Sequence, residues 1–211
     1  MYIGRIVAVG RTPNGGNAAM YRVSSRSFPN RRIVRSGDQL AVIPREGCEA
    51  DLAKNPYISY NCLRFAGEWA VATNGSQTDP IAEKIASGMP VRDAIALGLL
   101  ALDFEHDSLD TPRIVAVAHK KDPVGFLGIV RRDALLVREM KLADGKAFYL
   151  STYEKNRPAD GNCDECFGAR TAAEAARFVI DGGVFAEFTN PVTACAAVAA
   201  EDGFELAFET V

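Results

Sequence analysis

The sequence predicts an α+β fold made by a single domain over residues 1–211, with paired sheets that carry helices on their outer faces. The first observation is the order of the segments, because strand-like and helical segments fall in separate blocks. A parallel βαβ protein requires strict alternation of strand and helix, which this chain lacks. The second is continuity, since no repeat, linker or low-complexity segment divides the 211 residues. The third is composition, because 48% hydrophobic residues supply ample material for a core.

The first third of the chain is predicted to be β structure. Its segments are apolar or alternate between apolar and polar residues, and a turn-rich stretch at residues 12–17 separates the first two. Ala66-Gly67 between two such segments predicts a hairpin. The predicted strands are Tyr2–Val9, Ala18–Ser25, Gln39–Pro44, Ser59–Phe65 and Glu68–Thr73.

The middle of the chain begins with two predicted helices, Asp79–Ser87 and Val91–Phe104. Pro90 lies between them, where a proline can open the second helix. That second helix places Ile95 and Leu99 on roughly one apolar face. Strands then return at Arg113–His119, Gly125–Val130, Leu135–Met140 and Lys146–Thr152.

The last part of the chain is predicted to hold two more helices and one strand after a polar loop. Thr171 and Glu174 form a capping-box pattern that starts a helix ending at Asp181. Asn190-Pro191 is interpreted as the start of a helix of small residues that runs to Ala200. Phe204–Phe208 is the final predicted strand.

Charge and composition exclude several broad classes of function. A net charge of −3 gives the whole molecule no bias towards nucleic acid or acidic membranes. No apolar run reaches the roughly 18 residues of a membrane span, and the N-terminus lacks the pattern of a secretion signal. We therefore expect a cytoplasmic protein that binds neither nucleic acid nor membrane.

The five cysteines do not predict a disulfide framework or a metal site. Cys163 and Cys166 form the only Cys-x-x-Cys pair, and a structural zinc would need two more ligands. His106 and His119 lie far from that pair in the sequence. We expect reduced cysteines in a loop and no bound metal, and the purpose of the pair stays open.

The segment Tyr21–Arg32 has the highest density of polar functional groups. Arginine presents fork-like donors that suit phosphate and carboxylate groups. In an extended strand, alternate side chains share one face, and a turn after this strand delivers the rest. A solvated arginine-rich loop is the alternative. The candidate binding residues of this segment are Arg22, Ser24, Arg26, Asn30 and Arg31.

Two further clusters follow predicted strand boundaries. Tyr60 and Asn61 lie at the start of a strand, where both side chains can position a polar ligand. Asn74 and Gly75 end the next strand, where backbone N–H groups can face a ligand. The alternatives are an ordinary sheet tyrosine and a plain turn.

An acidic cluster at residues 103–107 ends the second helix, and Arg113 follows it. Acidic residues near a helix C-terminus oppose the helix dipole, which favours another use for Asp103 or Glu105, and exposed charge is the alternative. One carboxylate near arginines can hold an amide or transfer a proton. No Gly-x-Ser-x-Gly or His-Glu-x-x-His motif is present, and Met1 precedes Tyr2, so no terminal Ser, Thr or Cys nucleophile is expected.

Several of these segments, in the same order, resemble the archaeal-type IMP cyclohydrolases. The resemblance is carried by Met1–Gly10, Tyr21–Arg31, Asn55–Asn61, Thr73–Ser76 and Thr111–Ile114. It covers most of the chain and is sharpest in the first 115 residues. It implies a four-layer αββα fold of the Ntn-hydrolase type, without a processed terminal nucleophile.

The resemblance also implies a reaction, a ligand and a division of roles. The substrate would be 5-formamidoimidazole-4-carboxamide ribotide (FAICAR), and the product inosine monophosphate (IMP), formed with loss of water and without a cofactor. Tyr60 and Glu105 would orient the amide and move protons, and Arg113 would stabilise the oxygen that gains charge. The base would be fixed by Asn61, Asn74 and Gly75, and the phosphate and polar groups bound by Arg22, Ser24, Arg26, Asn30 and Arg31.

Two other functions remain open on the sequence. One is a different amide-bond hydrolase on the same fold, which would need a new terminal nucleophile. The other is a purine-nucleotide-binding regulator without turnover. The sequence leaves the oligomeric state open as well, although flat outer faces would leave room for a homo-oligomer.

Overall fold

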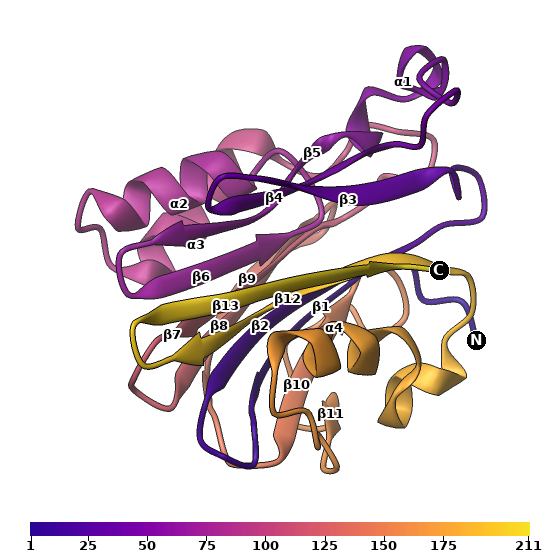
Figure 1. Ribbon diagram of the computed structural model, residues 1–211. Coiled ribbons are helices and arrows are strands. Elements are labelled where there is room, and N and C mark those ends of the chain that lie inside the picture. Colours follow the sequence, from indigo (N-terminus) through magenta and orange to yellow (C-terminus); the bar gives the residue numbers. More distant parts are fainter.

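The computed structural model describes residues 1–211 and contains two antiparallel sheets and four α-helices (Figure 1). The α+β prediction is therefore confirmed. The six-stranded sheet has the order β11-β10-β1-β2-β12-β13, and the seven-stranded sheet runs in sequence order from β3 to β9. The longest helix has 12 residues, and no helix has the combination of length and apolarity that a membrane crossing requires.

The predicted strand boundaries agree closely with those of most observed strands. The observed strands of the six-stranded sheet are β1 (Ile6–Arg11), β2 (Asn17–Ser24), β10 (Lys146–Ser151), β11 (Cys163–Asp164), β12 (Pro191–Ala200) and β13 (Gly203–Thr210). In the seven-stranded sheet they are β3 (Arg31–Ser36), β4 (Gln39–Pro44), β5 (Tyr60–Ala66), β6 (Trp69–Thr73), β7 (Arg113–His119), β8 (Val124–Arg131) and β9 (Ala134–Lys141). The predicted hairpin at Ala66-Gly67 joins β5 to β6, and Gly67 takes a positive φ of 60° there.

Three of the four α-helices lie where the sequence predicts helices, and the first was not predicted. They are α1 (Asp51–Lys54), α2 (Thr78–Ala86), α3 (Val91–Leu102) and α4 (Ala172–Asp181), with short 3₁₀ turns η1 (Pro56–Ile58) and η2 (Gly183–Glu187). Thr171 caps α4 by accepting a hydrogen bond from the N–H of Glu174, as predicted. The carboxylate of Glu174 accepts from the N–H of Arg170, one residue earlier than a capping box requires.

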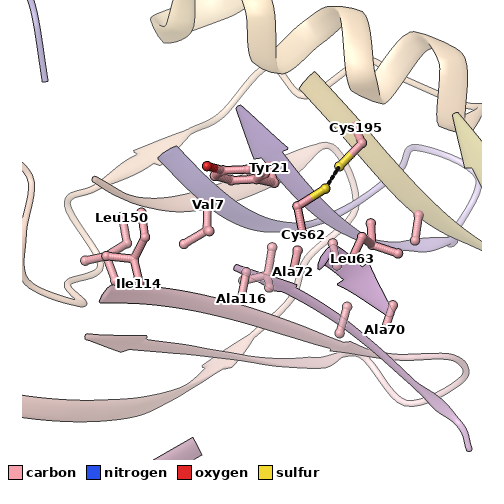
Figure 2. Close-up of a cluster of buried hydrophobic side chains, with 14 of the residues drawn as sticks. Val7, Tyr21, Cys62, Leu63, Ala70, Ala72, Ile114, Ala116, Leu150 and Cys195 are labelled. Atoms are coloured by element: carbon pink, nitrogen blue, oxygen red, sulfur yellow. Dashed lines mark hydrogen bonds between the residues drawn. The ribbon is translucent and has the colours of Figure 1, made fainter. Parts of the chain in front are cut away.

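A single apolar layer of 25 buried residues joins the two sheets. Figure 2 shows part of it, with Tyr21 of β2 and Cys195 of β12 on one side and Leu63 of β5 on the other. The Sγ atoms of Cys62 and Cys195 lie 3.8 Å apart across this layer. Small side chains at such positions let the two sheets approach each other closely.

Two further apolar clusters cover the outer faces of the sheets. One packs α2 and α3 on the seven-stranded sheet, with Ile81, Ile95 and Leu99 among its buried residues. The other packs α4 on the six-stranded sheet, with Val179 and Phe185 in it. Figure 1 shows α2 and α3 on one side of the paired sheets and α4 on the other.

The helix predicted for residues 191–200 is wrong, because this segment is strand β12. It pairs with β2 on one side and β13 on the other, so its backbone groups are used in two ladders. Cys195 and Ala197 face the other sheet, while Ala194 and Ala196 face α4. Since both faces are buried, the strand shows no polar alternation, and its alanines suggested a helix.

The structure corrects two boundaries that bear on the site. The predicted strand Tyr2–Val9 begins only at Ile6, and Gly4 takes a positive φ of 79°. Arg31–Ser36, for which no strand was predicted, forms edge strand β3, which pairs with β4. Exposed arginines on β3 suit an edge strand, because charge opposes pairing with another chain.

Candidate active site

A cavity of about 140 Å³ lies at the end of the sandwich where the first residues, the β2–β3 connection and the α3–β7 loop meet. In Figure 1 this is the end that carries the N-terminus and α1. Three arginines and two acidic residues are among its walls. It is lined by Tyr2, Gly4, Arg5, Ser24, Ser25, Arg26, Ser27, Phe28, Arg31, Asn55, Tyr57, Ile58, Glu105, Asp107, Ser108, Leu109, Thr111, Thr152 and Tyr153.

The centre of the site is an ion pair between Arg5 and Glu105. The Nη2 atom of Arg5 donates to Glu105 Oε2 at 2.9 Å, and Nη1 donates to Oε1 at 3.2 Å. The two side chains are 11% and 1% exposed. Burial raises the pKa of Glu105 above its ordinary value, and the attraction of Arg5 and Arg113 offsets that rise only in part. A carboxyl group with a raised pKa in an arginine-lined cavity suits proton transfer.

The loop after α3 fixes Glu105 in place. Asp103 takes φ 55° and ψ −174°, a backbone conformation that normally only glycine adopts. Its carbonyl accepts from Arg113 Nε at 2.8 Å, which holds this strained residue. The N–H of Glu105 donates to the carbonyl of Thr111, and Asp107 accepts from the N–H and hydroxyl of Thr111. The loop is therefore a fixed support for the carboxylate.

Arg113 and Gly75 support Glu105 from behind and are absent from the cavity wall. Arg113 Nη1 lies 3.9 Å from Glu105 Oε1 and donates to Gln77 Oε1 at 3.1 Å. A Cβ at Gly75 would lie 2.6 Å from Arg113 Nη1 and 2.6 Å from Gln77 Oε1. Gly75 therefore permits the close approach of Arg113 to Glu105.

A pair of buried tyrosines lies close to these charges. The hydroxyls of Tyr21 and Tyr60 are 2.6 Å apart, so each fixes the other. Burial raises the pKa of both phenols, although the charges of Arg31 and Arg5 lower it again in part. Both tyrosines therefore remain protonated at neutral pH. Tyr60 is 8% exposed and does not reach the cavity wall itself.

Arg31 has a buried N–H donor that makes no hydrogen bond within the protein. Its side chain lines the cavity and is buried, and Nε donates to the carbonyl of Phe28 at 3.0 Å. Its Nη1 atom is buried without any hydrogen-bond partner in the protein. A buried guanidinium nitrogen without a partner is costly, so a ligand oxygen at this position would stabilise the arrangement.

Ser24 and Arg26 also line the cavity, whereas Asn30 does not. Ser24 is buried at the end of β2, and Arg26 is exposed, with its guanidinium carbon 4.3 Å from the centre of the Tyr2 ring. Asn30 is exposed, and its carbonyl accepts from the N–H of Arg45.

Arg22 has a place in the interior rather than on the cavity wall. Its Nη atoms donate to the carbonyls of Ile180, Phe185 and Phe188, at 2.8, 3.0 and 2.5 Å. Its Nε donates to Ser24 Oγ at 2.9 Å, so Arg22 and Ser24 do share one face of the strand. Burial lowers the pKa of Arg22 to about 10. Arg22 therefore ties the end of α4 and η2 to β2, and it reaches the cavity only through Ser24.

Asn61 and Asn74 use their amides within the protein and are absent from the cavity wall. Asn61 Nδ2 donates to the carboxylate of Asp79 at 2.9 Å. Asn74 Nδ2 donates to the carbonyl of Pro112 at 2.9 Å, and its Oδ1 accepts from the N–H of Ile114 at 2.8 Å. Asn74 thus joins β6 to the start of β7, directly behind Arg113.

Reasoning from residue types missed Arg5, Thr152 and Tyr153. Arg5 was placed inside a predicted strand, where an arginine gives no sign of a buried partner 100 residues away. The available signal was Gly4, whose positive φ interrupts strand geometry. A Cβ at Gly4 would lie 2.0 Å from Thr152 Oγ1.

The cysteine pair lies outside the wall of this cavity. Cys163 is half-buried in β11 and Cys166 is exposed, and neither lines the cavity. No group of three or more His, Cys, Asp or Glu side chains is arranged to hold a metal ion. The structure assigns the pair no role.

Comparison with known proteins agrees with the resemblance of the sequence motifs. A family model described as "IMP cyclohydrolase-like protein" matches residues 2–203. The chain is 46% identical to the IMP cyclohydrolase of Methanosphaera stadtmanae over 99% of both chains. It is 48% identical to that of Methanocella arvoryzae over 98% of this chain and 96% of the relative. With that of Halobacterium salinarum it shares 48% identity over 84% of this chain and 83% of the relative. The chain therefore belongs to the IMP cyclohydrolase-like family.

Proposed function

We propose that this protein is an IMP cyclohydrolase, which converts FAICAR to IMP with loss of water. The observation that carries the proposal is the match over nearly the whole chain to proteins named IMP cyclohydrolase. The charged cavity supports it, because it combines a buried carboxyl group with arginine donors. These are the groups that an anionic substrate and a proton-transfer reaction require.

The reaction is intramolecular. The carboxamide nitrogen of FAICAR bonds to the formyl carbon, and the formyl oxygen leaves as water with one proton from each of the two reacting nitrogens. Because both reacting groups belong to one molecule, the protein need not supply a covalent nucleophile or a cofactor. Its task is to fold the two groups together, stabilise the oxygen that gains charge and move protons.

Glu105 and Arg31 are the residues to which we assign this chemistry. Glu105 moves a proton between the attacking nitrogen and the departing oxygen, since burial raises its pKa towards neutrality. Arg31 donates Nη1, which has no partner in the protein, to the formyl oxygen. Tyr60, fixed by the hydroxyl of Tyr21, does not reach the cavity wall, so we assign it a positioning role next to the charges of Arg31 and Arg5.

The remaining candidate residues mainly hold the catalytic groups in position. Arg113, Asn74 and Gly75 hold the Glu105 carboxylate and its loop, which is a positioning role. Asn61 lies beside them at the start of β5, with its amide on Asp79.

The same proposal extends to the fold and the setting of the enzyme. We infer that the two sheets with their outer helices are one domain with the four-layer αββα arrangement of the Ntn-hydrolase type. The three apolar clusters support this, since they fill the three interfaces that four layers create. We propose that the enzyme acts in the cytoplasm, and its outer faces leave room for a homo-oligomer.

The test is absorbance-monitored conversion of FAICAR to IMP by the purified protein, with a matched reaction lacking protein. Turnover far above the uncatalysed rate supports the cyclohydrolase. Tight IMP binding without turnover would contradict it and favour the nucleotide-binding regulator. Neither turnover nor binding would contradict both functions.

A further inference from the structure

Gln77 occupies the N-cap position of α2 but does not cap the helix. Residues favoured at this position accept a hydrogen bond from the first turn, whereas the Gln77 side chain makes no such contact. Gln77 is 0% exposed and is absent from the cavity wall. A buried amide that serves neither the helix nor the cavity must satisfy its hydrogen bonds elsewhere in the protein.

The amide of Gln77 has a fixed orientation. Its Nε2 atom donates to Asn74 Oδ1 at 2.8 Å and to the carbonyl of Ile114 at 3.3 Å, so both of its protons are used. Asn74 cannot be turned over, because its Nδ2 donates to the carbonyl of Pro112 and its Oδ1 accepts from the N–H of Ile114. Gln77 therefore presents its oxygen, and not its nitrogen, to Arg113.

The guanidinium of Arg113 is held by two neutral acceptors. Its Nε donates to the carbonyl of Asp103 at 2.8 Å, and its Nη1 donates to Gln77 Oε1 at 3.1 Å. The same Nη1 lies 3.9 Å from Glu105 Oε1, beyond hydrogen-bond distance. A Cβ at Gly75 would lie 2.6 Å from Nη1 and 3.5 Å from Glu105 Oε1, so glycine leaves no side chain between these two groups. The positive charge acts on the carboxylate through space, while the hydrogen bond goes to Gln77.

We propose that Gln77 is a positioning residue for the ring closure, which holds the Arg113 guanidinium beside Glu105 without a hydrogen bond between them. This inference rests on the proposed function. A hydrogen bond from a guanidinium to a carboxylate stabilises the charged form, which then binds a proton less tightly. By accepting from Nη1 in place of the carboxylate, Gln77 keeps the proton affinity of Glu105 higher than a direct contact would allow. A group that moves protons near neutral pH requires such an affinity.

Other charges around Glu105 do not depend on Gln77. The ionisable groups around its carboxylate are Arg5 before β1, Arg31 of β3, Tyr60 of β5, Asp107 of the same loop, Arg113 of β7 and Tyr153 after β10. Of these, only Arg113 bonds to Gln77. Loss of the Gln77 amide therefore reaches Glu105 through Arg113.

Replacing Gln77 by methionine isolates this contact, because the side chain keeps its length but loses the amide oxygen. The former partners of Nε2 stay satisfied, since Asn74 Oδ1 still accepts from the N–H of Ile114, and the Ile114 carbonyl from the N–H of Asn74. Only Arg113 Nη1 is left without a partner, and Glu105 Oε1 is an acceptor within reach. We expect a direct hydrogen bond to form, after which Glu105 binds its proton roughly tenfold less tightly.

The test is titration of the Glu105 carboxyl group, followed by carbon NMR of protein with isotope-labelled glutamate. The signal is assigned by its absence from Glu105→Gln. The pKa of Glu105 should fall in Gln77→Met, by the amount that corresponds to the tenfold loss of proton affinity. In an Arg113→Met background, Gln77→Met should have no further effect, because the guanidinium that it releases is absent.

The control is Gln39→Met, the same change at the only other glutamine of the chain. Gln39 is half-buried at the start of β4 and does not line the cavity, so the titration of Glu105 should stay unchanged. Gln77→Asn is a second variant that withdraws the acceptor from Arg113, and it decides the matter if Gln77→Met does not fold. Asparagine is favoured at a helix N-cap, so α2 keeps its start.

Turnover supplies a second readout. The limb of the pH profile of kcat that Glu105→Gln abolishes should move to lower pH in Gln77→Met. KM for FAICAR should change by less than about twofold, because Gln77 does not line the cavity.

An unchanged pKa of Glu105 in the folded Gln77 variants, or an equal fall in the Arg113→Met background, would overturn the inference. If the wild type nevertheless converts FAICAR, the proposed function stands and only this inference fails. If the wild type neither converts FAICAR nor binds IMP, the proposed function fails and with it the part of Gln77 in the reaction. The NMR titration still decides in that case whether Gln77 acts on Glu105.

Discussion

Replacing Arg5 by methionine tests the ion pair at the centre of the site. The substitution keeps much of the side-chain volume but leaves the Glu105 carboxylate, 1% exposed, without its bidentate partner. Only Arg113 Nη1, 3.9 Å away, then offsets its charge. Removing one partner of a buried pair lowers the free energy of unfolding by about 3–5 kcal/mol. Arg11→Met is the control, because the Arg11–Asp144 pair is partly exposed and contributes about 0–1 kcal/mol.

The loss of stability should depend on pH, with a sign fixed by Glu105. Its pKa in the folded protein is raised by burial, and loss of Arg5 raises it further. A carboxyl group with a raised folded pKa binds more protons in the native than in the unfolded state, so stability falls as pH rises. The penalty is smallest near the ordinary glutamate pKa of about 4.3 and complete above the raised folded pKa.

The assay is urea unfolding of wild type, Arg5→Met and Arg5→Met/Glu105→Gln between about pH 5 and pH 8. We expect the gap between wild type and Arg5→Met to widen as pH rises. The double variant should recover most of the loss at neutral pH, because a neutral amide needs no counter-ion. A gap that is constant with pH, or no recovery in the double variant, would refute the reasoning.

Three further changes test other parts of the account. Glu105→Gln should lower the rate of FAICAR conversion by a factor of roughly 10²–10⁴, as loss of a general acid or base does. The affinity for IMP, measured by calorimetry, should change little. An unchanged rate would exclude Glu105 from proton transfer. Arg22→Met should lower the free energy of unfolding, measured in urea, by roughly 3 kcal/mol or more, because several buried carbonyls lose their donor. A loss below about 1 kcal/mol would contradict the structural role of Arg22. Gly4→Ala should lower both the melting temperature and IMP affinity, because its Cβ would lie 2.0 Å from Thr152 Oγ1. Gly37 also has a positive φ, 61°, but a Cβ there would have nothing within 4 Å, so Gly37→Ala should lower only the melting temperature. Equal effects of the two variants on affinity would contradict this reasoning.

Apolar or alternating segments bounded by turn residues predicted most strands, including β2, which is buried on both faces, and an apolar face at helical spacing predicted α3. The failure at residues 191–200 has a definite cause. Strand β12 lies between two apolar layers, with Cys195 in one and Ala196 in the other, so no polar face marks its period. The high helix propensity of alanine then favoured the wrong element, and pairing on both edges decided the outcome.

The site was predicted in part because several of its residues are polar groups at the ends of strands and helices. Arg31 and Glu105 were found in this way, and both line the cavity. Arg22 shows the limit of the method. The same fork of donors suits a phosphate and a set of backbone carbonyls, and only the position of η2 shows that Arg22 binds carbonyls.

Arg5 shows the complementary limit. Its partner Glu105 is 100 residues away, and neither residue's local pattern refers to the other. The contact arises because β1 begins at the same end of the sandwich at which the α3–β7 loop ends. Pairing of this kind is a property of topology, which local spacing does not encode.

The central claim is that this cavity closes the second ring of IMP, and the rate of FAICAR conversion by wild type and Arg31→Ala tests it most directly. Arg31 carries the buried donor without a partner, so its loss should remove a contact made with the oxygen that gains charge. We predict rapid conversion by the wild type and a rate lower by roughly 10²–10³ in Arg31→Ala, with unfolding unchanged to within about 1 kcal/mol. Full turnover in Arg31→Ala would contradict the claim and place the reaction elsewhere.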